Sequence, residues 1–491
     1  METLARAANR GSVPTGYEID NSLKLERANS EYLSRTPSSN GNQQIFTFSS
    51  WVKFSHINSG VSEWSTLFSA GDLTSTGPSF RIGHHTNNSL QVSFYTNSAY
   101  TGYYRTDALH RDTAAWYHFV CAIDTTQGTN TNRVKIYVNG EQASTDSVVS
   151  HIAQNYDSGV NTGISHRIGH GVNMQTYASE YVSETHFVDG QALAPTDFGE
   201  FDEDSGIWKP KAYTGSYGTN GFYLDFADGA DLGDDESGNG NDWTENNITS
   251  ADQATDTPTN NFCTLFPPPD AVTGTEPSVK EGGTTMFGGV SSTQNAFGTM
   301  GVRSGKWYFE STITDDGGVA TNNHNFGVID PEQITYVMTS GRDIGASPAG
   351  WACASNSLPR NNNASASGAN GTGSLAENEI MGVAIDMDNG KIWWHRQGTW
   401  TSINSTVGNP ANGTTPAFSN LLTATDNFVI PAGGFYVNDG NQTRVMNFGG
   451  YAQAVFTAVG TYTDANGYGS FAYQPPSGYY ALCTKNLAEY G

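Results

Sequence analysis

Three acidic residues at alternate positions, Glu200, Asp202 and Asp204, are the arrangement that most directly suggests catalysis. On a strand they would line one face, as the two carboxyl groups of a glycosidase must. A retaining glycosidase needs those groups about 5 to 5.5 Å apart, whereas residues i and i+4 of a strand lie roughly 13 Å apart. A Ser-Gly pair and a proline follow the run, which favours a solvated turn. We therefore expect no catalytic residue here.

Oxygen-bearing side chains gather in a second, glycine-broken segment. They are Asp231, Asp234, Asp235, Asn239, Asn241 and Asp242. Calcium takes about six to eight oxygen ligands of this kind, so it is the one cofactor that the sequence suggests, although the spacing is not that of an EF-hand. The alternative, which we favour, is a loop of Asx turns whose side chains accept hydrogen bonds from backbone amides.

Two histidine-containing segments echo one another, with Arg-Ile-Gly-His at 81–84 and again at 167–170. We expect them to be equivalent strands of one sheet. With their neighbours they supply His84, His85, His166 and His170, and imidazoles that met there would bind a transition metal. No cysteine or acidic residue shares the spacing, which favours ordinary half-buried strand histidines.

Four tyrosines, Tyr95, Tyr100, Tyr103 and Tyr104, are interleaved with asparagine, serine, threonine and glycine. Aromatic faces stack on the apolar face of a pyranose, and neighbouring amides and hydroxyls bond its ring hydroxyls. The segment is therefore a candidate glycan-binding site. The alternative is that these tyrosines pack the edge of a sheet or a subunit interface.

Strands must position all of these residues. The chain holds 56 glycines and 12% aromatic residues, a composition typical of turn-rich β structure. Residues 45–54 alternate with apolar side chains on both faces, which predicts a strand inside a sandwich, and 116–124 repeats the pattern. Residues 133–138 end at an Asn-Gly pair, the signal of a tight hairpin.

The second half of the chain has its own strand signals. Residues 306–313 and 379–387 each predict a strand, and an Asp-Asn-Gly turn joins the latter to a strand at 391–396. A polar, proline-marked stretch separates the two halves, where we place a domain boundary. The predicted plan is an N-terminal arm at 1–20, a domain at 21–250, a linker at 251–262, a domain at 263–485 and a C-terminal tail at 486–491.

The charge of the chain excludes several partners. It carries 23 basic and 48 acidic residues, a formal charge of -25. Such a surface repels phosphate backbones and anionic lipid, so we expect neither nucleic-acid binding nor membrane insertion. Four scattered cysteines predict no disulfide framework, and we find no signal peptide, phosphate-binding loop or nucleophile elbow.

The first half resembles the laminin-G-like, concanavalin-A-like jelly roll over about residues 20–250. The resemblance rests on the 45–54 strand, on Ala-Trp-Tyr-His-Phe-Val at 115–120 followed by the Tyr-Val-Asn-Gly hairpin at 137–140, and on the acidic, glycine-rich run that ends at Trp243. These pieces occur in the family's order. The resemblance implies a two-layered β-sandwich.

The second half, about 258–485, resembles a SPRY domain, itself a concanavalin-A-like sandwich. The matching pieces include Gly-Lys-Trp-Tyr-Phe-Glu at 305–310, Asn-Phe-Gly-Val at 325–328 and the stretch 380–394; after Trp394 the pattern departs, with His-Arg-Gln-Gly in place of an Asn-Gly turn. The resemblance implies that loops grip a peptide partner. The candidate ligand-binding residues on those loops are Trp351, His395, Arg396 and Trp400.

The tandem order of the two modules resembles structural proteins of marine tailed phages, tail fibres among them. This implies an all-β protein of two concanavalin-A-like jelly-roll sandwiches on a virion surface, binding a bacterial glycan or protein through sandwich loops. The N-terminal arm would anchor it to other virion proteins, and we expect a homo-oligomer, most simply a trimer. The alternatives are a capsid or tail decoration protein that binds no receptor, and a polysaccharide depolymerase.

Overall fold

The computed structural model describes residues 16–55, 64–74, 76–145, 149–172, 176–266, 277–288, 293–317, 324–354, 358–370, 375–436 and 442–491. The chain forms two compact units, Pro14–Asn260 and Asn261–Gly491, each with its own core. Within the described ranges, the chain lacks a helix with the length and apolar character needed to cross a bilayer.

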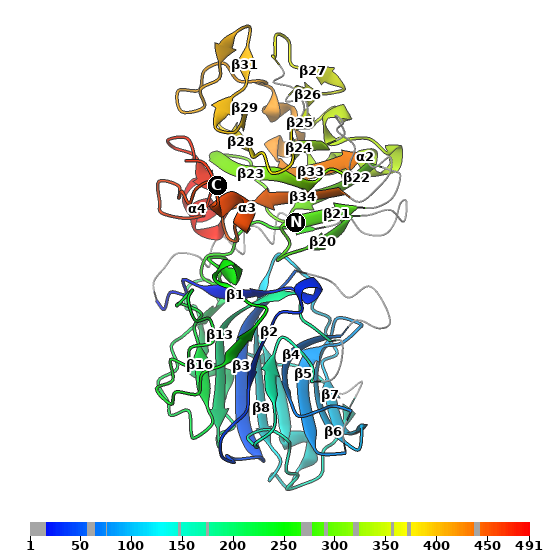
Figure 1. Ribbon diagram of the computed structural model, residues 1–491, viewed down its shortest axis with the longest axis vertical. Coiled ribbons are helices and arrows are strands. Elements are labelled where there is room, and N and C mark those ends of the chain that lie inside the picture. The colour runs from blue at the N-terminus through cyan, green and yellow to red at the C-terminus, as the bar shows by residue number, and fades with distance from the viewer. Residues whose placement is uncertain are drawn as a thin grey trace. The chain divides into compact units, whose positions relative to one another are not determined.

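The first unit is a sandwich of two eight-stranded sheets (Figure 1). Sheet A contains, in spatial order, β10 (Glu141–Gln142), β9 (Val134–Val138), β8 (Trp116–Asp124), β3 (Ile45–Phe54), β13 (Glu180–Asp189), β1 (Ser22–Leu25) and β18 (Gln253–Ala254), with β16 (Phe222–Leu224) also paired to β13. Sheet B contains β11 (Val149–Ser150), β7 (Ala99–Arg105), β6 (Leu90–Thr96), β5 (Ser79–His84), β4 (Ser65–Ala70), β12 (His166–Ile168), β2 (Tyr32–Arg35) and β17 (Thr244–Asn246). A separate hairpin joins β14 (Gly199–Phe201) to β15 (Trp208–Pro210).

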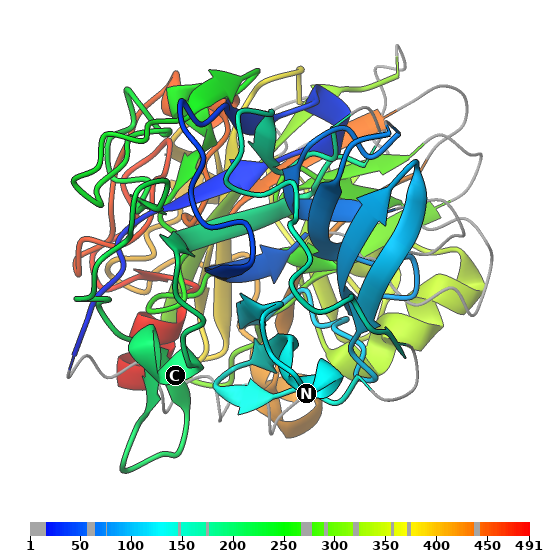
Figure 2. The same ribbon diagram turned by 90° about the horizontal axis from the view of Figure 1, so that it is seen from below.

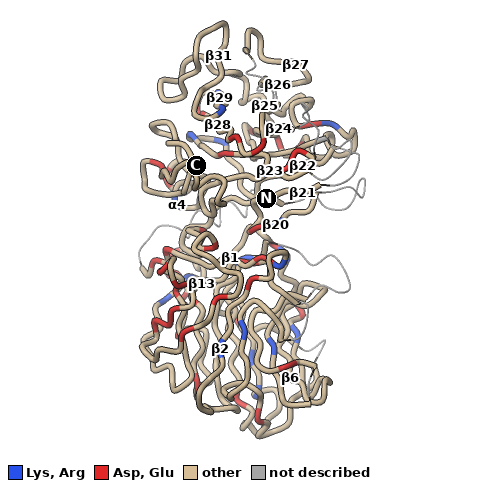
Figure 3. Tube along the Cα trace, in the orientation of Figure 1, with Lys and Arg blue, Asp and Glu red and all other residues tan. Residues whose placement is uncertain are grey.

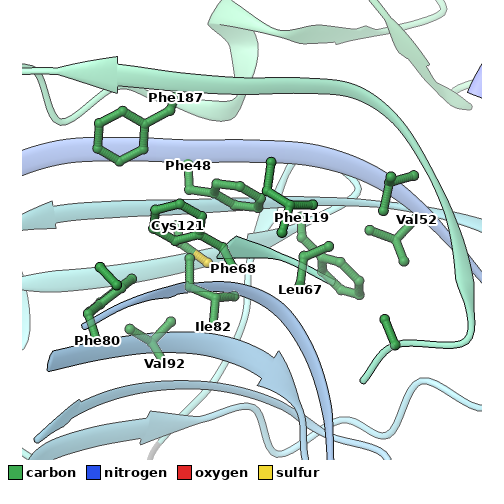
Figure 4. Packing of buried hydrophobic residues seen from close by; sticks show 14 of the residues in the cluster. Phe48, Val52, Leu67, Phe68, Phe80, Ile82, Val92, Phe119, Cys121 and Phe187 are labelled. Carbon is green, nitrogen blue, oxygen red and sulfur yellow. The ribbon is translucent and has the colours of Figure 1, made fainter. Parts of the chain in front are cut away.

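The core of the first unit lies between the two sheets (Figure 4). Phe48 of sheet A stacks on Phe68 of sheet B with ring centroids 5.2 Å apart, and Phe46 meets Phe80 edge-on at 5.4 Å. Alternate residues of each strand supply this layer because successive side chains point to opposite faces of a sheet. Cys121 belongs to the same core, and all four cysteines are buried with free thiols.

The second unit is also a sandwich. Sheet C contains β19 (Leu265–Phe266), β22 (Thr293–Gly298), β33 (Ile430–Tyr436), β24 (His324–Ile329), β25 (Gly350–Ala354), β26 (Pro359–Asn361) and β27 (Ala364–Ser365). Sheet D contains β20 (Ser278–Lys280), β21 (Thr285–Gly288), β34 (Gln442–Asn447), β23 (Lys306–Asp315), β28 (Met381–Asp386), β29 (Lys391–Arg396) and β30 (Thr399–Trp400), with β35 (Tyr480–Ala481) parallel to β23. A small hairpin pairs β31 (Ser402–Ile403) with β32 (Thr406–Val407). The α-helices within the described ranges are α2 (Ile334–Ser340), α3 (Ala454–Thr457) and α4 (Thr484–Tyr490).

Large aromatic side chains fill the second core. Trp307 and Trp394 of sheet D lie in one buried cluster with Phe326 and Trp351 of sheet C. On the other face of sheet C, α2 packs Val337 and Met338 into a smaller apolar cluster. Strands make up 41% of the structure and helices 10%. The protein is thus all-β, with two β-sandwiches in tandem, as predicted.

The hairpins close as the sequence indicates. Asn139 and Gly140, between β9 and β10, have φ angles of 49° and 84°. Gly390, between β28 and β29, has a φ angle of 64°. Positive φ angles are those that tight hairpin turns require, which is why asparagine and glycine occupy these positions.

The segment 251–262 is not a free linker, which corrects the predicted plan. Its β18 pairs with β1. Asp256 then lies fully buried, with its carboxylate 2.7 Å from Lys53 Nζ and accepting a hydrogen bond of 3.0 Å from Trp116 Nε1. The polar composition of the segment therefore reflects a buried ion pair that fastens it to sheet A.

The two ends of the chain also differ from the plan. Most of the predicted tail at 486–491 is helical, because Leu487 of α4 packs into the second core. Residues 1–15 of the predicted anchoring arm lie outside the described residues. Tyr17, at the end of that arm, donates a hydrogen bond of 2.8 Å to Glu184 of β13.

Replacing Asp256 with alanine is expected to lower the free energy of unfolding of the first unit by about 3 to 5 kcal/mol, because the buried Lys53 ammonium loses the carboxylate 2.7 Å from it. Urea unfolding measures the loss. The control is Glu203→Ala at an exposed position. Joining Lys53→Met to Asp256→Leu should restore much of the stability, whereas an Asp256→Ala protein as stable as the control would contradict this role.

Because of Glu180 in β13, we expect the stability of the first unit to depend on pH. The side chain of Glu180 is buried; Oε2 accepts a hydrogen bond of 3.2 Å from Ser65, and Oε1 has no hydrogen-bond donor among the described residues. Burial raises the pKa of Glu180 to about 7. Below pH 4.5 the carboxyl is neutral in both the folded and the unfolded state. As pH rises from 4.5 to 7, the carboxyl lowers the stability of the fold increasingly, because only the unfolded state then ionises freely.

The variant Glu180→Gln should therefore be more stable than the natural protein by about 1 to 3 kcal/mol above pH 7, and the difference should vanish near pH 4. Thermal unfolding across this pH range measures it. A difference that does not change with pH would show that Glu180 is ionised in the fold.

Candidate functional site

The hairpin of β6 and β7 carries the tyrosines that the sequence proposed for glycan binding. Figures 1 and 2 show β4 to β7 side by side in shades of blue. A β-bulge in β7 shifts the register, so that Tyr100 pairs with Tyr95 while Tyr103 pairs with Ser93. Directly opposed residues share a face, so these three tyrosines lie together on the outer face of sheet B.

The three rings contact one another. The centroids of Tyr95 and Tyr100 are 4.7 Å apart, and those of Tyr100 and Tyr103 are 5.4 Å apart at a steep angle. Tyr100 is 48% exposed, Tyr103 is half-buried and Tyr95 is buried. The cluster thus offers solvent two aromatic surfaces supported by a third ring.

A buried arginine joins this cluster to a tryptophan. The Arg81 guanidinium lies 3.8 Å from the centre of the Trp64 ring, and its Nη2 donates a hydrogen bond of 2.7 Å to Tyr95 Oη. Burial raises the pKa of Tyr95, so the hydroxyl stays protonated. We call Trp64, Arg81, Tyr95, Tyr100 and Tyr103 the tyrosine patch.

Sequence reasoning missed two members of the patch. Arg81 alternates with Phe80 and Ile82, and this pattern could have shown that it shares the face of Ser93 and Tyr95. No pattern indicated Trp64, because it precedes β4. Conversely, the inclusion of Tyr104 was wrong: it is 2% exposed, faces the core, and accepts a hydrogen bond of 3.1 Å from the Ile152 amide.

Polar side chains border the patch. Arg105 Nε donates a hydrogen bond of 2.8 Å to Gln91 Oε1, and Gln91 Nε2 donates one of 2.6 Å to Ser93. Arg105 is half-buried beside Tyr103. Gln91 and Ser93 are buried, so a pyranose stacked on the exposed rings would meet the half-buried Arg105 as its polar neighbour.

The two Arg-Ile-Gly-His segments, at 81–84 and 167–170, lie in equivalent strands, as predicted. They form β5 and β12, which flank β4, so that Ser69 pairs with both Arg81 and Arg167. Their histidines do not meet. His84 stacks on Phe54 at 4.1 Å, whereas His170 stacks on Tyr177 at 3.9 Å.

The other two histidines are equally separate. His166 Nε2 accepts a hydrogen bond from the Asn161 amide, and His85 lies edge-on to Trp64. Among the described residues, these four histidines do not come together as a metal-ligating group. Burial lowers the pKa of His84 to about 3 and that of His166 to about 4, so both are neutral strand histidines.

The acidic loop is built on Asp235. Its Oδ1 accepts hydrogen bonds from the Tyr223 and Ser237 amides, and its Oδ2 accepts from the Ser237 hydroxyl and the Asn241 amide, all between 2.8 and 2.9 Å. Asp242 accepts from the Asp235 amide at 3.2 Å. These are the backbone caps of an Asx-turn loop.

The remaining predicted calcium ligands are also engaged or turned to solvent. Asp231 caps the Gly233 amide, Asn239 donates to the Gly218 and Gly221 carbonyls, and Asp234 is exposed. No three carboxylates of this fully described loop converge as ion ligands. Arg35 donates a hydrogen bond to Asn241 of this loop.

The SPRY-like group is not a loop surface, which corrects the prediction for it. Trp351 lies in β25 with no exposed area, inside the core, and donates to Asn420. His395 is buried in β29, bonded at 2.7 Å to Tyr308 Oη. Arg396 pairs with Glu379, and Trp400 packs edge-on to His395 at 4.9 Å.

The acidic run at 200–204 forms the turn expected of it. Asp202 Oδ1 accepts from the amides of Asp204 and Ser205, and Lys209 pairs with Glu200 at 3.4 Å and Asp202 at 3.3 Å. Hydrogen bonds from Ser205 lower the pKa of Asp202 to about 2. The carboxylates belong to an exposed hairpin, and acidic residues are spread over both units (Figure 3).

Comparisons with known proteins agree with the fold of the first unit. A family model described as the concanavalin A-like lectin/glucanases superfamily matches residues 27–186. No curated protein matches the chain.

Similar solved structures include a heptameric SAP-like pentraxin from Limulus polyphemus, with 15% identity, a TM-score of 0.27, and coverage of 36% of this chain and 78% of that one. They also include the SPRY domain of human HERC1, with 14% identity, a TM-score of 0.28, and 37% and 96% coverage. The PSpry domain of TRIM65 has 12% identity, a TM-score of 0.25, and 37% and 91% coverage.

Adding a calcium chelator should leave the melting temperature of the protein unchanged within about 1 °C, because backbone amides and Arg35 already satisfy the acidic loop. Differential scanning calorimetry with and without EDTA measures this, and magnesium-loaded EDTA controls for ionic strength. A fall of several degrees that added calcium reverses would restore the calcium interpretation.

Proposed function

We propose that this chain is a non-enzymatic binding protein on the virion surface of a tailed bacteriophage, in a tail fibre or related appendage, that attaches to a glycan or protein on the bacterial surface. The lectin/glucanase-like sandwich supports a binding role for carbohydrate or protein. The phage setting rests on the resemblance of the tandem modules to phage structural proteins.

The observation that carries the binding role is the tyrosine patch. Its rings are held by strand pairing and by the Arg81 contacts rather than by a mobile loop. Rigid aromatic side chains lose little entropy when they bind, so such a surface suits recognition of a sugar. Its ligand contacts would be stacking and hydrogen bonding, with no bond made or broken.

Single patches of this size bind weakly, and display in several copies compensates. Linked copies raise the effective concentration of each site without new contacts. The proposal therefore includes a homo-oligomer, most simply a trimer, attached to other virion proteins by the N-terminal arm.

A second candidate function is a decoration protein in which the same patch contacts a neighbouring subunit. The exposure of Tyr100 favours this as much as it favours a glycan. Electron microscopy of virions labelled on this chain separates the two: a projecting, distal position supports attachment, and a continuous lattice supports decoration.

The variant Tyr100→Ala/Tyr103→Ala should weaken binding to bacterial surface polysaccharides on a glycan array by about tenfold or more, because both solvent-facing rings are removed. The matched control is Tyr462→Ala in the second unit, where the tyrosine is 45% exposed. Equal binding by both variants and the natural protein would contradict the proposed site.

A further inference from the structure

The second unit contains a polar cavity of about 330 Å³. It lies against the face of sheet C that carries α2, opposite the core. Ala352 and Ala354 of β25, with Ala346, form an apolar part of its lining. The volume is at the lower end of the range of small-molecule sites, the size of one sugar residue rather than of an oligomer.

The polar wall of the cavity is fixed by its own hydrogen bonds. Asp343 Oδ1 accepts from the Ala346 amide at 2.8 Å, and Asp343 Oδ2 lies 3.0 Å from Arg360 Nη1. Arg360 Nη2 donates in turn to Asn363 Oδ1 at 2.6 Å. The carboxylate of Asp343, the guanidinium of Arg360 and the amide of Asn363 thus hold one another in fixed positions without a ligand.

One cationic side chain of the lining, Arg342, is available to bind a ligand. Arg342 lines the cavity, is exposed, and its guanidinium makes no hydrogen bond or ion pair within the described parts of the chain. The lining contains two cationic side chains, Arg342 and Arg360, and one anionic side chain, Asp343. Its net charge is therefore +1, in a chain whose formal charge is -25. Such a site attracts an anion that most of the protein surface repels.

A buried histidine also lines the cavity. His324 is 2% exposed, and neither Nδ1 nor Nε2 makes a hydrogen bond to a residue that the structure describes. Burial lowers the pKa of His324 to about 3, so the ring is neutral and offers one donor and one acceptor. Buried polar groups are nearly always satisfied, which points to a polar occupant.

We propose that this cavity, which we call the Arg342 cavity, binds a sugar residue that bears a carboxylate, such as a hexuronate. Arg342 would pair with the carboxylate. Asp343, Asn363 and Arg360 present acceptors and donors together, which suits ring hydroxyls; a phosphate would call for donors alone. The alanines suit the apolar face of the ring.

This inference goes beyond the proposed function, because the cavity belongs to the second unit and its binding can be measured with the tyrosine patch altered. If Tyr100→Ala/Tyr103→Ala did not weaken binding on the glycan array, the proposed site in the Arg342 cavity would still stand. Conversely, failure of the Arg342 cavity to bind would leave the tyrosine patch as the glycan site.

The test is to titrate the whole protein with sodium glucuronate and to measure binding by saturation-transfer NMR. We expect saturable binding that Arg342→Gln weakens about tenfold or more and that Arg111→Gln, at an exposed position of the first unit, leaves unchanged. Glucose has the ring without the carboxylate and acetate the carboxylate without the ring, so each should bind more weakly than glucuronate.

Two results would overturn the proposal. Absence of saturable glucuronate binding would remove the site, and acetate binding as tightly as glucuronate would reduce it to an anion site that does not recognise a sugar. The hydrogen bonds of Arg342 to Val337 and Asn295 are made by its backbone, so the variant should keep the natural melting temperature, and lost binding can then be assigned to the guanidinium. Polygalacturonate in a parallel titration shows whether the cavity accepts the residue within a polymer or only the free acid.

Discussion

The stacking of Phe68 between the two sheets of the first unit determines what the outside of sheet B can be. Phe68 contacts Phe48 at 5.2 Å and Phe187 at 5.7 Å. Because successive strand residues point to opposite faces, burying Phe68 turns Ser69 outward. Pairing with β5 then sets Arg81 beside Ser69, and from there the row continues to Ser93 and Tyr103. The tyrosine patch is thus a consequence of core packing, extended by one bulge.

A second constraint concerns the outer faces of the sheets, which are largely buried as well. Buried charges hold covering segments in place: Lys53 pairs with Asp256, and Lys24 pairs with Glu31 at 3.1 Å and Asp252 at 2.8 Å. In the second unit, the buried Glu310 carboxylate accepts hydrogen bonds from the Ala472 and Tyr473 amides. Such groups are costly to leave unpaired, so they specify where each segment docks more than they add stability.

Much of the fold could be predicted from the sequence, because period-two patterns and Asn-Gly turns are local signals. The strands at 45–54 and 116–124 and the hairpin at Asn139 follow directly from them. What failed depends on distant partners. The polar segment at 251–262 resembles a linker unless one knows that Asp256 meets Lys53, more than 200 positions earlier along the chain. Tyr104 was misassigned because strand alternation places either Tyr103 or Tyr104 in the core and only packing decides which. Trp351 was misassigned because aromatic composition does not show that its strand lies in the core.

The candidate sites illustrate the same limit. A run of tyrosines indicated the patch, yet the bulge decided which of them share a face, and the supporting Arg81 came from another strand. The Arg342 cavity left no motif at all, since its lining comes from β22, β24, β25, β26 and the segment after α2. Both sites are built on strands or held by fixed hydrogen bonds, and such frameworks position ligand groups more precisely than loops do. Recognition at the tyrosine patch is therefore expected to depend on strand register, whereas the Arg342 cavity depends on Arg342, Asp343 and Asn363, which lie in segments between the strands.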